Sequence, residues 1–128
     1  MKKIAFTFIV TTLLLGLSAC GKNPLGASVE VKVVNLLNAP AKGKTVYLFK
    51  DVLTNNSKPG DAIKQVVTDD NGIALFRLNL AEFNIFESQT SLYFGVFYTV
   101  GDNNILAGSN AITVAHGDEK SIELKIPL

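Results

Sequence analysis

Residues 28–34 have the sequence Ser-Val-Glu-Val-Lys-Val-Val, the clearest indication of β-structure in the chain. A valine stands at every second position from 29 to 33, with Glu30 and Lys32 between them. Successive side chains of a β-strand point to opposite faces, so this alternation predicts a strand with one buried and one solvated face. Valine also favours strands because its branched side chain packs well on a pleated surface.

Similar strand signals return along the rest of the chain, separated by segments that contain Asn, Asp, Gly or Pro. Residues 69–72 and 101–104 are predicted hairpin turns, because Asn and Gly tolerate positive φ. Residues 79–90 break the pattern and predict a helical turn or an ordered loop. The pattern predicts an all-β fold, an antiparallel β-sandwich of about seven strands over residues 28–128. The other six strands are expected at residues 45–49, 63–68, 73–78, 92–100, 105–114 and 121–126.

Short motifs in residues 28–80 carry a resemblance to known families. The motif V-x-V-x-V occupies residues 29–33, N-A-P-x-K-G occupies residues 38–43, V-x-L occupies residues 46–48, and T-D-x-x-G-x-A-x-F-x-L spans residues 68–78. This part of the chain resembles prealbumin-like and carboxypeptidase-regulatory-like Ig-type modules. The resemblance implies a seven-stranded Greek-key sandwich with a buried Phe76, and it implies no activity.

The composition excludes several classes of protein. The chain has 128 residues, a formal net charge of +1, one Cys and one His. That length suits one domain, and that charge lacks the basic excess that a nucleic-acid partner requires. A single Cys excludes a disulfide framework and a Cys-clustered metal site, and a single His excludes a His-rich one. We therefore expect no metal and no cofactor.

The first 19 residues have the features of a secretory signal. A basic start at Lys2 and Lys3 precedes an apolar run over residues 4–17, and Ser18 and Ala19 end it with small side chains. The apolar run is shorter than the ~20 residues of a membrane-spanning helix. It also lacks the polar face of an amphipathic helix. Residues 1–19 are therefore a predicted signal peptide.

The sequence Leu17-Ser18-Ala19-Cys20 resembles the lipobox of bacterial lipoproteins. This resemblance implies a diacylglyceryl group on the Cys20 sulfur and cleavage of the chain before Cys20. Residues 20–27 are then a short lipidated tether, and the covalent lipid makes a membrane the first partner. In enteric-type bacteria, an Asp directly after the lipidated cysteine resembles an inner-membrane retention signal. This chain has Gly21 at that position. The expected location is therefore the outer membrane of a bacterial cell envelope.

His116 is the only imidazole that could act as a general base, with Asp118 or Ser109 as its partner. The simpler interpretation is a solvated turn residue. The transthyretin-like hydrolases resemble this chain in fold, but they use several His and Arg residues and a Tyr-Arg-Gly-Ser C-terminus. This chain has only His116 and Arg77 and a different C-terminus. We therefore expect no catalytic residues and no enzymatic activity.

Oxygen-bearing side chains at Asp69, Asp70 and Asn71, with Asp61 nearby, suggest a calcium loop as one hypothesis. Turn formation needs the same residue types, and the EF-hand pattern is missing, so we favour the turn. Three more carboxylates have no spacing that specifies a glycosidase pair. They are Asp51, Glu82 and Glu87.

Two of the predicted strands carry aromatic residues on the face opposite the expected core. These residues are Tyr47, Phe49, Tyr93 and Phe97. If they are exposed together, they form a partner surface. We favour the alternative that residues 80–86 fold over this face, since the apolar side chains of that segment also need burial.

The function predicted from these observations is a small lipid-anchored cell-envelope protein that acts as a non-enzymatic binding or structural module. Its partner, a protein or a glycan, is not specified by any motif. One alternative is an envelope-assembly accessory or adhesin-like protein that recognises a protein through an edge strand. The other, from a different class, is a hydrolase built around His116.

Overall fold

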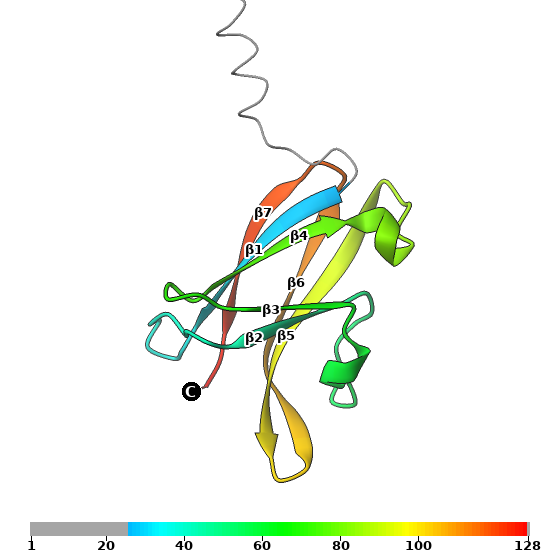
Figure 1. Ribbon diagram of the computed structural model, residues 1–128. Helices are drawn as coiled ribbons and strands as arrows, with labels where there is room; N and C mark the ends of the chain where they lie inside the picture. Colours follow the sequence, from blue (N-terminus) through cyan, green and yellow to red (C-terminus); the bar gives the residue numbers. More distant parts are fainter. Residues whose placement is uncertain (1–25, 128) are drawn as a thin grey trace, which may run out of the picture.

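The computed structural model describes residues 26–127 and shows two β-sheets packed face to face (Figure 1). One sheet has three strands in the order β4-β1-β7, and the other has four in the order β3-β2-β5-β6. This confirms the predicted seven-stranded β-sandwich. The strands are β1 (Gly26–Val34), β2 (Thr45–Phe49), β3 (Lys64–Val67), β4 (Ile73–Asn79), β5 (Gln89–Val100), β6 (Asn103–Ala115) and β7 (Glu119–Lys125).

The signal peptide, Cys20 and most of the predicted tether lie outside the described residues. Strand β1 begins at Gly26, two residues before the predicted start of the domain. Two short 3-10 helices, η1 (Pro59–Asp61) and η2 (Leu80–Phe83), complete the fold. Within residues 26–127, no helix is long and apolar enough to cross a membrane.

One strand pair departs from the antiparallel prediction, because β1 and β7 run parallel. The turn after β6 brings the chain back to the start of β1. There the N–H of Gly117 donates to the carbonyl of Gly26 over 2.6 Å, and the N–H of Ser28 donates to the carbonyl of Asp118 over 2.8 Å. Strand β7 therefore starts beside the beginning of β1 and follows it in the same direction.

The predicted hairpin at residues 69–72 is a tight turn, but the hairpin interpretation is wrong. Strand β3 lies in the four-stranded sheet and β4 lies in the three-stranded sheet, so this turn connects the two layers. The carbonyl of Gly72 accepts the N–H of Val33 over 2.7 Å, which holds the turn against β1. Gly72 has φ +75°, and a Cβ atom there would lie 2.6 Å from the Val33 carbonyl oxygen, so only glycine fits.

The core lies between the sheets, and its residues come from the alternating positions of the strands. Val29, Val31 and Val33 are completely buried, as the alternation predicts. Phe76 of β4 and Phe94 of β5 meet from opposite sheets, with ring centroids 5.1 Å apart in an edge-to-face arrangement. The burial of Phe76 agrees with the resemblance to the Ig-type modules.

Residues 79–90 contain the predicted helical turn, which is η2. The Asn79 side chain accepts the N–H of Ala81 and caps the start of the helix, and Asn84 ends it in the left-handed conformation with φ 58°. Leu80, the first residue of η2, and Ile85, just after it, are buried in the main core. The segment therefore closes one part of the core between the sheets.

Thr68 is the one buried polar residue among the described residues, and its hydroxyl joins two loops. It donates to the carbonyl of Ala41 over 2.6 Å and accepts the N–H of Lys44 over 2.9 Å. We expect Thr68→Val, in a soluble chain that starts at residue 21, to lower the free energy of unfolding by about 1–3 kcal/mol, since both partners lose their bond. Urea denaturation measures this. The exposed Thr113→Val is the matched control, and an equal loss in both variants would contradict the account.

Candidate functional site

The four aromatic residues singled out in the sequence lie on the outer face of the four-stranded sheet. Phe49 pairs with Tyr93 across β2 and β5, and Tyr47 pairs with Gly95. The Phe97 ring contacts the rings of Tyr47 and Phe49 with centroid separations of 5.6 and 6.1 Å. Tyr47, Tyr93 and Phe97 are half-buried, and Phe49 is only 5% exposed. We call these four residues the aromatic cluster.

The loop of residues 50–63 supplies part of the cover over this face. A Cβ atom on Gly95 would lie 3.0 Å from Leu53 Cδ1 and 2.9 Å from Leu106 Cδ1, so both leucines close over the glycine. The prediction that residues 80–86 cover the face is wrong. That segment follows β4 of the other sheet, so its buried side chains join the main core, and Phe86 is 74% exposed.

A polar cavity of about 670 Å³ lies between the loop of residues 54–58 and the tip of the β5–β6 hairpin. On one side of it, the N–H of Thr54 donates to Ser57 Oγ over 2.8 Å, and the N–H of Ser57 donates to the Thr54 carbonyl over 3.0 Å. These bonds fix the loop without using its exposed Asn side chains. The lining consists of asparagines at positions 55, 56, 103 and 104, together with Ser57, Lys58 and Asp102.

The cavity and the aromatic cluster belong to one continuous face. Phe97 pairs with Leu106, and Thr99 pairs with Asn104 two residues closer to the hairpin tip. Side chains two positions apart on a strand point to the same face, so Asn104 lies on the same face as Phe97 and Leu106, next to them on the side of the tip. Sequence reasoning missed this cavity because both Asn-rich segments resemble ordinary turns. The pairs of asparagines were the available signal.

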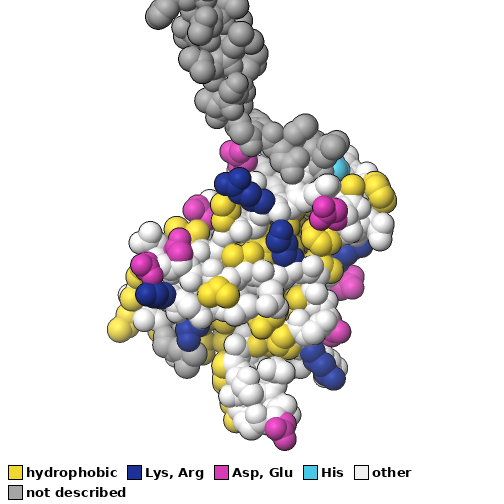
Figure 2. Space-filling view, in the orientation of Figure 1, with side chains coloured by type: hydrophobic (Ala, Val, Ile, Leu, Met, Phe, Trp, Pro, Cys, Tyr) yellow, Lys and Arg dark blue, Asp and Glu magenta, His cyan; other side chains and the backbone are white. Residues whose placement is uncertain are grey.

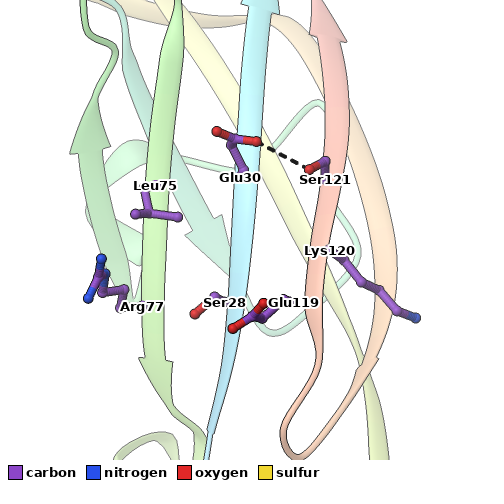
Figure 3. Close-up of a pocket in the computed structure, with 7 residues that line it drawn as sticks. All are labelled: Ser28, Glu30, Leu75, Arg77, Glu119, Lys120 and Ser121. Atoms are coloured by element: carbon purple, nitrogen blue, oxygen red, sulfur yellow. Dashed lines mark hydrogen bonds between the residues drawn. The ribbon is translucent and has the colours of Figure 1, made fainter. Parts of the chain in front are cut away.

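The three-stranded sheet has a shallower hollow of about 410 Å³ on its outer face (Figure 3). The Ser121 hydroxyl donates to Glu30 Oε2 over 3.3 Å, and the Lys120 side chain points away from the other residues drawn. Acidic and basic groups both line it, so no charge dominates. The lining residues are Ser28, Glu30, Leu75, Arg77, Glu119, Lys120 and Ser121.

His116 is exposed in the turn between β6 and β7, which also contains Asp118 but not Ser109. The Asp118 carboxylate accepts the N–H of Ala115 over 2.8 Å and lies 3.5 Å from Lys120 Nζ. Ser109 is seven residues back along β6, a distance of roughly 23 Å on an extended strand. Within residues 26–127, the structure shows no hydrogen bond between His116 and either residue.

The carboxylates considered as calcium ligands have separate roles or positions, and only that of Asp69 stabilises the β3–β4 turn. Asp69 Oδ1 accepts the N–H groups of Asn71 and Ile73 over 2.8 and 3.0 Å. Asp70 pairs with Lys42 over 2.9 Å on the surface, and Asp61 lies in η1. No group of three or more His, Cys, Asp or Glu side chains gathers as a metal site in the described part of the chain. Three other carboxylates are all exposed: Asp51, Glu82 and Glu87.

Strand β6 is an edge strand, and part of its open side is occupied by side chains of the same chain. The N–H of Ala111 donates to Asn110 Oδ1 over 2.8 Å, and the carbonyl of Thr113 accepts Lys120 Nζ over 2.7 Å. The bond from Ala115 to the Asp118 carboxylate occupies a third backbone group. An incoming strand would have to break these bonds, which is how natural sheets protect their edges. Residues 111–115 therefore do not favour the edge-strand hypothesis.

No family model and no curated protein sequence matches this chain. Among solved structures, the SpaB basal pilin from Lactobacillus rhamnosus GG is 16% identical with a TM-score of 0.52, and the match covers 82% of this chain and 98% of the pilin. The Bacillus anthracis TIE protein is 16% identical with a TM-score of 0.48, and the match covers 80% of this chain and 16% of the TIE protein. (S)-Allantoin synthase is 13% identical with a TM-score of 0.48, and the match covers 83% of this chain and 42% of the synthase.

This chain thus spans less than half of the last two proteins, and at these identities the likeness concerns the fold alone. The comparison with the pilin agrees with a prealbumin-like or Ig-like β-sandwich. The fold by itself does not separate a structural from a catalytic role.

Proposed function

We propose that this chain is a lipid-anchored protein of the bacterial cell envelope, and that its β-sandwich acts as a non-enzymatic binding or structural module. Lipid on Cys20 holds the mature protein to a membrane, with the outer membrane as its location. The partner surface is the outer face of the four-stranded sheet, which includes the aromatic cluster and the polar cavity. A fold shared with a basal pilin suits this role.

The position of Gly26 carries the proposal. Strand β1 begins at one end of the sandwich, beside the β6–β7 turn, and the β5–β6 hairpin extends beyond the other end (Figure 1). Gly26 is six residues after Cys20, a stretch that reaches at most about 20 Å. A lipid on Cys20 would therefore keep the Gly26 end near the membrane and direct the hairpin and its cavity away from it.

The arrangement of polar side chains supports a non-enzymatic role. The imidazole of His116 lies in the turn after β6, far from the hydroxyl of Ser109 on that strand, and the carboxylate of Asp118 stabilises the same turn. General-base catalysis requires such groups within hydrogen-bond reach of one another or of a substrate. The proposed module therefore acts by binding.

Detergent phase separation tests the anchoring. The full chain, expressed in a bacterium, should enter the phase of a nonionic detergent, because two or more acyl chains bury about 0.8 kcal/mol per CH₂ group in a micelle. A chain that starts at residue 21 lacks the signal and the cysteine, and it should remain in the aqueous phase. Recovery of the full chain in the aqueous phase would refute the proposal.

A further inference from the structure

We propose that the cavity between residues 54–58 and the β5–β6 hairpin tip binds a neutral carbohydrate chain. This inference deepens the proposed function, since it names the chemical class of the ligand for the proposed partner surface. The cavity of about 670 Å³ is within the range of about 300–1,000 Å³ that is typical of small-molecule sites.

The first argument is the hydrogen-bonding chemistry of the lining. Each asparagine amide offers two N–H donors and a carbonyl acceptor, and each sugar hydroxyl both donates and accepts. The side chains of Asn55, Asn56 and Asn103 have no hydrogen-bond partner within residues 26–127. They approach from two separate segments, so a ligand between them would be bound on both sides. Asn104 accepts the Thr99 hydroxyl over 3.3 Å and keeps its N–H donors available.

The second argument is charge. The lining contains one cation, Lys58, and one anion, Asp102, so their charges offset each other. A site for a phosphate, an acidic peptide or a cationic ligand would have an excess of one sign. Figure 2 shows the hairpin end of the molecule as mostly white, the colour of uncharged polar side chains and backbone. A neutral ligand with many hydroxyl groups fits such a surface.

The third argument is the apolar surface beside the amides. Phe97 and Tyr47 are half-buried on the same face, with their rings in contact at 5.6 Å. A sugar ring has hydroxyl groups around its edge and C–H groups on its faces, so a longer chain would use both surfaces. The bonds between Thr54 and Ser57 fix the backbone that carries Asn55 and Asn56, which lowers the entropy lost on association.

The test uses the chain from residue 21, with neutral hexasaccharides of glucose, xylose and N-acetylglucosamine as probes and hexagalacturonate as the anionic comparison. Isothermal titration calorimetry should detect at least one neutral probe and no preference for the anionic one. The combined variant Asn55→Ala and Asn103→Ala should weaken that binding about tenfold, because it removes hydrogen bonds from both sides of the cavity. Asn71→Ala, in the β3–β4 turn, should leave it unchanged.

A second measurement does not depend on the variants. Backbone amide NMR signals of the wild-type chain should shift on titration at residues 54–58 and 101–104. Absence of binding to every neutral probe, equal binding by the combined variant, shifts located elsewhere or preference for hexagalacturonate would each overturn the proposal. Detergent partitioning is independent of these residues. A chain that is anchored but binds no sugar refutes this site alone, and a chain that binds sugar but is not anchored refutes the anchor alone.

Discussion

Phe76→Ala is expected to lower the free energy of unfolding by about 3–5 kcal/mol, the usual cost of a phenylalanine deleted from a core. The Phe76 side chain is completely buried on β4, and its ring meets that of Phe94 from the opposite sheet. Alanine would leave a cavity at the contact between the two layers. It would also remove an aromatic pair worth about 0.5–1.5 kcal/mol beyond its buried area.

Urea denaturation of the chain from residue 21 measures this effect. Phe86→Ala is the matched control, because Phe86 is 74% exposed and its loss should change stability by no more than about 0.5 kcal/mol. If Phe76→Ala destabilised the protein no more than Phe86→Ala does, the assignment of the core would be wrong.

The strands could be predicted from the sequence because local periodicity reports which side chains are buried. Alternate residues of β1 and β4 have this periodicity, and they are core residues in the structure: Val29, Val31, Val33, Ala74, Phe76 and Leu78. The pairing of strands is harder to predict from sequence, since alternation shows which face of a strand is buried but not which strand lies beside it. The β6–β7 turn that leads into the parallel pairing of β1 with β7 is joined to β1 by a hydrogen bond between Gly117 and Gly26, which are 91 residues apart in sequence. No local pattern contains that information.

The candidate site was predictable only in part for the same reason. Alternation in β2 and β5 predicts the aromatic cluster on the outer face, and the core accordingly contains the intervening residues Leu48, Phe94 and Val96. The sequence does not identify the segment that covers this face, because residues 80–86 and the region of Leu53 both contain apolar residues. Only the close approach of Leu53 to Gly95 distinguishes them. The polar cavity joins two segments distant in sequence, and each alone resembles a turn.

Cys20→Ser should abolish lipid attachment completely. The predicted modification forms a thioether on the cysteine sulfur, and the chain has no second cysteine that could replace it. Cells fed a palmitate analogue should label the wild-type chain and leave Cys20→Ser unlabelled, with its signal peptide still attached. Ser18→Ala is the matched control, because it keeps a small side chain near the cleavage site and should remain labelled. A labelled Cys20→Ser variant would contradict the account.

The mass of the mature N-terminal peptide shows whether lipid is attached to Cys20. The wild-type chain is expressed in a bacterium, purified from the membrane fraction, digested and analysed by mass spectrometry. We predict a mature chain that begins at Cys20, with a diacylglyceryl group on its sulfur. An N-terminus at any other residue, or an unmodified Cys20 in a freely soluble protein, would contradict a lipid-anchored module at the cell envelope.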